Sequence, residues 1–137
     1  MATRTFTTMV QFKDILNPLV TKAVSITCNR LLGTLQELIM SEYYDAFEPE
    51  KYVRSFQFYD SAMTKMVNNL MGEIFMDAKS MNYGAYWDGE AQLYMSAQGF
   101  HGTSEIQTEG RFWQAFIDFC ENNAIRILKE ELKKVLE

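Results

Sequence analysis

Residues 8–47 read TMVQFKDILNPLVTKAVSITCNRLLGTLQELIMSEYYDAF, and this stretch decides the fold. Apolar side chains recur in it every three or four residues, which is the period of a helix with one buried face. Asn17-Pro18 interrupts the pattern, because proline lacks the amide donor that a helix interior needs. We expect a helix over about 8–47, with either a kink at this dipeptide or a fresh start capped by Asn17.

A β-hairpin is predicted after this helix. Glu48-Pro49-Glu50 ends the helical pattern, and residues 52–57 alternate as in a strand or an extended lead-in. Two candidate strands follow over about 61–67 and 70–78, with Asn68-Asn69 between them. Asparagine tolerates the left-handed backbone that a two-residue hairpin turn requires. The sequence therefore predicts a small antiparallel sheet at this position.

Residues 79–109 differ from the rest in being rich in glycine and aromatic residues, and we expect a long variable loop. Together with Asp77 the segment holds five acidic side chains against the single basic Lys79. A loop of this length is usually functional or mobile. Its aromatic side chains are candidates for an interface, because aromatic residues are enriched where proteins meet. These interface candidates are Tyr83, Tyr86, Trp87, Tyr94 and Phe100.

A second strongly helical pattern covers about 111–136. Phe112 and Phe116 lie on its apolar face and are expected in the core, whereas Trp113 falls off that face and is an interface candidate. The chain as a whole is predicted to be a single α+β domain. Its parts are a helix at about 8–47, a β region at about 51–78, a loop at about 79–109 and a helix at about 111–136.

Composition excludes several classes of protein. The chain of 137 residues has a net charge of −5, which argues against a nucleic-acid-binding domain with a basic patch. The first residues lack the apolar run of a signal peptide, and no stretch has the roughly 20 apolar residues of a membrane span. Cys28 and Cys120 each lie in an apolar helical pattern, so free buried thiols are expected.

Catalytic, metal-binding and cofactor-binding motifs are absent from the sequence. His101 is the single histidine, and neither cysteine has the local signature of a catalytic thiol. Zinc would need several cysteine or histidine ligands, and the sequence offers three at scattered positions. Neither glycine pattern that binds phosphate occurs. We therefore expect no enzyme, no metal, no cofactor and no small-molecule substrate.

One block of sequence resembles a family of bacteriophage structural proteins. Tyr52-Val53-Arg54-Ser55-Phe56-Gln57-Phe58, followed by Asp60-Ser61, is similar to a motif of the small tail-completion or head–tail joining proteins of long-tailed phages. Tyr52, Arg54 and Ser61 match that motif, while Ser55 stands where threonine is common. Gly110-Arg111-Phe112-Trp113-Gln114-Ala115-Phe116 resembles the start of the last helix in the same family, which adds Arg111 to the interface candidates.

The motif also has a physical reading. In an extended segment Tyr52 and Arg54 project to one face, where the guanidinium can stack on a ring or pair with helix carboxylates. A role in stabilising the fold and a direct contact with a partner both fit this geometry.

The resemblance implies a virion structural protein of the neck, made in the cytoplasm of the bacterial host. Such a connector assembles with itself as a ring between capsid portal and tail tube, and contacts other neck, portal or tail proteins. An acidic loop facing the channel would repel passing DNA without binding it, although a solvated loop explains the same charges. The alternative is a small intracellular adaptor that grips one protein partner through the aromatic loop at 79–109.

Overall fold

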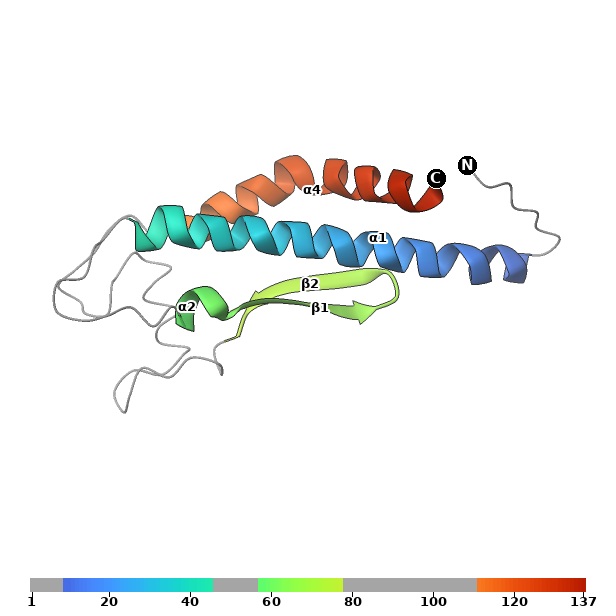
Figure 1. Ribbon diagram of the computed structural model, residues 1–137, viewed down its shortest axis with the longest axis horizontal. Coiled ribbons are helices and arrows are strands. Elements are labelled where there is room, and N and C mark those ends of the chain that lie inside the picture. The colour runs from blue at the N-terminus through green and yellow to red at the C-terminus, as the bar shows by residue number, and fades with distance from the viewer. Residues whose placement is uncertain (1–8, 46–56, 78–110) are drawn as a thin grey trace.

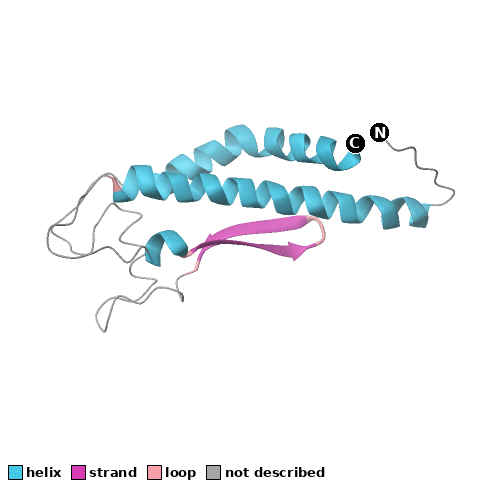
Figure 2. Ribbon diagram, viewed as in Figure 1, coloured by secondary structure: helices cyan, strands magenta, loops and turns pink. Residues whose placement is uncertain are grey.

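The computed structural model describes residues 9–45, 57–77 and 111–137. A long central helix carries a second helix along one side and a β-hairpin along the other (Figures 1 and 2). The predicted α+β class and the order of elements are confirmed. In chain order the elements are α1 (Met9–Leu38), η1 (Ile39–Tyr44), α2 (Gln57–Asp60), β1 (Ala62–Asn68), β2 (Met71–Met76) and α4 (Phe112–Leu136).

Helix α1 runs unbroken through Pro18, so the alternative of a fresh start capped by Asn17 is wrong. Proline leaves the carbonyl of Asp14 without its helical donor. Both Asp14 and Pro18 are exposed, so water can reach this carbonyl at little cost.

The end of the first helical segment widens into a π-helix, η1. There the amide of Asp45 donates to Met40 O at 2.8 Å, five residues back. Tyr43 and Tyr44 are adjacent in sequence, and both are buried in this wider turn. The sequence pattern gave no sign of the change in helix type.

The hairpin forms with its turn one residue later than predicted. Asn68 pairs with Met71, so the turn is Asn69-Leu70 and not Asn68-Asn69. A shift in register between Met66 and Asn68 leaves Val67 as the extra residue of a bulge. This insertion moves the turn by one position along the chain.

The extended lead-in predicted for residues 52–57 falls mostly outside the described residues. For its last residue, Gln57, the prediction of an extended backbone is wrong, because Gln57 begins the short helix α2. The turn of helix brings Phe58 into the core at 1% exposure.

Close contact with α1 explains a glycine in the hairpin. A Cβ atom at Gly72 would overlap Cys28 Sγ of α1, so only glycine lets strand β2 approach the helix this closely. The inner face of the hairpin is formed by alternate residues, as expected for a strand period of two. They are Ala62, Thr64, Met66, Gly72, Ile74 and Met76.

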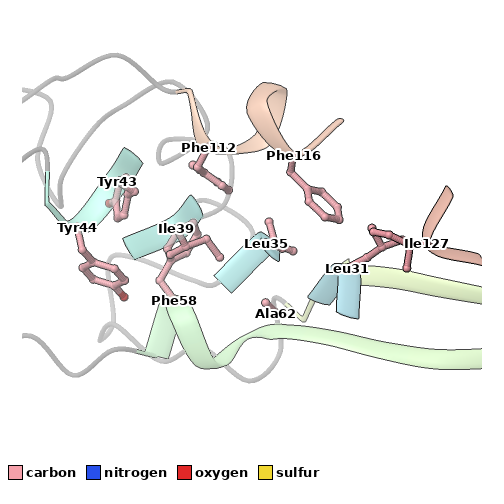
Figure 3. Packing of buried hydrophobic residues seen from close by; sticks show 10 residues of the cluster. All are labelled: Leu31, Leu35, Ile39, Tyr43, Tyr44, Phe58, Ala62, Phe112, Phe116 and Ile127. Carbon is pink, nitrogen blue, oxygen red and sulfur yellow. The ribbon is translucent and has the colours of Figure 1, made fainter. Parts of the chain in front are cut away.

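The core lies where α1, η1, α2 and the start of α4 meet (Figure 3). Aromatic rings dominate it: Phe58 and Phe112 pack edge-to-face with centroids 5.3 Å apart, and Tyr43 lies 4.9 Å from Phe58. Such arrangements add to the free energy gained from burial alone. Leu35 and Ile39 of the central helical segment are fully buried between these rings and the hairpin. We call this end of the molecule the aromatic base.

Candidate interaction surface

Apolar side chains are exposed at the end of the molecule opposite the aromatic base. Helix α1 extends beyond the hairpin turn and beyond the C-terminal end of α4 (Figure 1). On this extension Met9 is 66% exposed, and Phe12 and Ile15 are each more than one third exposed. In the hairpin turn and in the strand residues beside it, the exposed fraction is 59% for Leu70, 50% for Met71 and 47% for Val67. We call these six residues the tip surface.

The hairpin turn is held firmly in place. The Thr21 hydroxyl of α1 lies 2.5 Å from Asn69 O and donates to it, and the Leu70 amide donates to Asn68 Oδ1 at 2.9 Å. The second bond is the local side-chain-to-backbone bond by which asparagine stabilises turns. Because the backbone of this turn is already fixed, binding through its apolar side chains costs little further backbone entropy, which favours association.

The outer face of the hairpin carries both charge and apolar surface. Lys65 Nζ lies 4.0 Å from Glu73 Oε1 and 5.2 Å from the centre of the Phe75 ring. Met63, opposite Phe75 in the register, is 42% exposed. This face therefore continues the apolar character of the tip surface toward the aromatic base.

Ser61 has a structural position in the described chain. It is fully buried, and its hydroxyl donates to Phe58 O at 2.6 Å. Its own carbonyl accepts the Asp77 amide at 2.7 Å, which closes the open end of the hairpin. Ser61 thus joins α2 to the sheet.

Trp113 and Arg111 lie at the start of α4. Trp113 is half-buried, with its ring 5.8 Å from that of Phe116, so it packs on the core and also keeps exposed surface. Arg111 is exposed, and its carbonyl accepts the Ala115 amide at 2.8 Å. Their roles in an interface stay predictions.

The remaining residues singled out in the sequence lie outside the described residues. They are Tyr52 and Arg54 of the motif, and Tyr83, Tyr86, Trp87, Tyr94 and Phe100 of the segment at 79–109.

A network of ion pairs that sequence reasoning missed joins α1 to α4. Arg30 Nη1 lies 2.9 Å from both Glu130 Oε2 and Glu131 Oε1. Arg126 and Lys134 complete the network, at 2.6 Å from Glu130 and 3.1 Å from Glu131. The two sides are about 100 residues apart in sequence, and no local pattern signals such a pairing.

The network shifts the titration of its carboxylates. The hydrogen bond from Arg30, followed by that from Arg126, lowers the pKa of Glu130. The hydrogen bond from Lys134, with a further one from Arg30, lowers the pKa of Glu131, whose side chain is 5% exposed. Both groups are therefore held in the charged form that the cations need.

The described residues offer little chemistry. Residues 9–45, 57–77 and 111–137 contain no group of three or more side chains that could hold a metal ion. Within these ranges, no helix is long and apolar enough to cross a membrane. Both cysteines are free and half-buried, and desolvation raises the pKa of Cys120, which disfavours the reactive thiolate.

Comparison with known proteins places the chain in one family. Searches of curated proteins and of solved structures give no significant match. A sequence model of the family described as YomN matches residues 9–137, from the first residue of α1 to the C-terminus. YomN is a gene product of a Bacillus phage region. The chain belongs to the YomN family and is a phage-associated protein.

Proposed function

We propose that this phage-associated protein is a structural component of the virion neck, where copies assemble as a ring between the capsid portal and the tail tube. The observation that carries the proposal is the tip surface. A chain in a phage-associated family presents apolar side chains on a preformed turn and on an extended helix, in positions that a contact with protein would bury. The resemblance of the Tyr52–Ser61 motif to head–tail joining proteins points the same way.

Exposure of this kind favours association with protein. Burying an apolar side chain stabilises an interface by about 25 cal/mol per Å² removed from water. Leu70, Met71 and Val67 each leave about half of their surface in water within one copy, and a partner could bury that half. If a neighbouring copy covers them with a different part of its surface, the contact is heterologous, and such contacts generate closed rings when the rotation closes.

The work of such a ring is mechanical, so we propose that the protein is not an enzyme. Its partners would be further copies of itself and the neighbouring portal, neck or tail proteins. The alternative of a cellular adaptor depends on the aromatic segment at 79–109, and no observation on the described residues favours it.

Removing the gene from the phage that encodes the protein tests the proposed role. We expect filled heads and separate tails in lysates examined by electron microscopy, with joining restored by the native gene supplied in trans. The Leu70→Glu/Met71→Glu variant should fold but fail to restore joining. Normal virions without the protein, or virions in which mass spectrometry finds none of it, would overturn the proposal.

A further inference from the structure

The outward face of α4 is a second association surface, distinct from the tip surface. The face toward α1 buries Phe112, Phe116 and Ile127. On the opposite side, in the middle of the helix, Ile125 is 69% exposed, the highest value for a large apolar side chain among the described residues. An isoleucine gives a helix no intrinsic advantage at such a position. Burial of this side chain against a partner would remove apolar surface from water and so stabilise a contact.

Opposite charges flank Ile125 along the same face. Asp118 and Glu121 precede it, Lys129 and Lys133 follow it, and all four are exposed. The helix dipole favours acidic residues in the first turn and basic residues in the last turn. It accounts for Lys133 but not for Asp118, Glu121 or Lys129, which lie more than a turn from either end of α4.

The charges of α4 divide into two groups. Those on its flank toward α1, such as Glu130 and Glu131, are paired within the chain. On the outward face, Glu121, Lys129 and Lys133 take part in no ion pair within the described residues. A shallow hollow lies between this face and that flank, and it is lined by Ile125, Arg126, Lys129, Glu130 and Lys133. On this face the acidic side chains thus precede Ile125 and the basic ones follow it, and both groups are exposed to a partner.

We propose that this face binds a second copy of the chain, with two α4 helices crossing antiparallel at Ile125. Glu121 lies four residues before Ile125 and Lys129 four residues after it, so a two-fold axis at Ile125 places each Glu121 opposite the Lys129 of the other copy. Asp118 and Lys133, seven residues before and eight after, extend the complementarity. Such a contact is isologous: the same residues are used on both copies.

Charge complementarity favours a second copy as the occupant, because the acidic half of the face lies opposite the basic half when two copies of α4 meet antiparallel. The contact goes beyond the proposed ring and does not depend on it. Figure 1 shows α4 on the side of α1 away from the hairpin turn, so the two surfaces can act at once.

Mixing two charge-reversal variants tests this geometry. Glu121→Lys and Lys129→Glu each place like charges opposite each other in a pair of identical copies, and each should raise the dissociation constant of the dimer about tenfold or more. An equal mixture restores opposite charges at both contacts. We therefore expect the mixture to form heterodimers at a protein concentration and low salt at which neither variant alone associates. Sedimentation velocity with one variant labelled measures this difference.

Matched controls separate this effect from a general effect of charge. Glu37→Lys and Lys22→Glu make the same changes at exposed positions of α1 and should leave the native dimer unchanged. Ile125→Cys should form a disulfide between copies under mild oxidation, since the residue meets itself on the axis, whereas native protein with Cys28 and Cys120 should not. A monomeric native protein, single variants that dimerise like the native chain, or a mixture that stays monomeric would overturn the proposal.

Discussion

The aromatic base and the tip surface hold apolar side chains in opposite situations. At the base, Phe58 and Phe112 are 1% and 2% exposed and contact each other within one chain. At the tip, Leu70 and Met71 are at least half exposed although the turn beneath them is fixed by hydrogen bonds. The base therefore stabilises the fold, whereas the tip keeps apolar side chains in water on a turn that is already formed.

The largest expected effect on stability lies at the base. Phe58→Ala removes a ring that three other aromatic rings contact, and we expect a loss of about 3–5 kcal/mol in the free energy of unfolding. Leu70→Ala at the tip should cost less than about 0.5 kcal/mol. Urea unfolding of both variants measures the difference. Equal losses would show that the division into base and tip is wrong.

A smaller effect is expected between the two regions, where β2 meets α1. Gly72→Ala drives a methyl group into Cys28 Sγ and should destabilise the fold by about 1–3 kcal/mol. Combining it with Cys28→Ala removes the sulfur, so the double variant should lose less than the sum of the single losses, by about 1 kcal/mol. Strictly additive losses would contradict the close contact.

Acid should weaken the α1–α4 junction through Glu131. Its pKa in the folded chain is lowered from 4.5 by the hydrogen bonds from Lys134 and Arg30. A carboxylate of this kind contributes its stabilisation above the unfolded pKa and loses it as the pH falls through the folded value. Thermal unfolding midpoints should therefore drop below about pH 5, and more steeply for native protein than for Glu131→Gln. Glu37→Gln, at an exposed position of α1 outside both proposed contacts, should follow the native curve, and parallel curves for all three proteins would refute the assignment.

The smallest expected effect on stability is at the tip itself. Leu70→Ser/Met71→Ser replaces exposed apolar side chains with polar ones. The free energy of unfolding, measured in urea, should therefore change by no more than about 1 kcal/mol. The same change should abolish assembly into species larger than the α4 dimer, as judged by light scattering. A large loss of stability would mean that the turn packs within one chain after all.

The helices and the hairpin were predictable because they depend on local patterns. The three-to-four-residue spacing located both long helices, and Asn68-Asn69 located the turn to within one residue. The bulge at Val67 shifts the turn without a local sequence signal. The π-helix and the Arg30 network depend on packing between distant segments, which periodicity does not encode. The exposure of Leu70 and Met71 was not predicted for the same reason. The pattern shows which residues share a face, but it does not show whether that face is buried within the chain.

The mass of the purified full-length protein at high concentration tests the central claim most directly. By native mass spectrometry, with electron microscopy of the same sample, we expect closed rings of many copies for the native chain. Leu70→Glu/Met71→Glu should abolish the rings and keep the α4 dimer, whereas Ile125→Glu should keep the rings. A native protein that is monomeric at every concentration, or rings that persist in the Leu70→Glu/Met71→Glu variant, would contradict assembly through the tip surface.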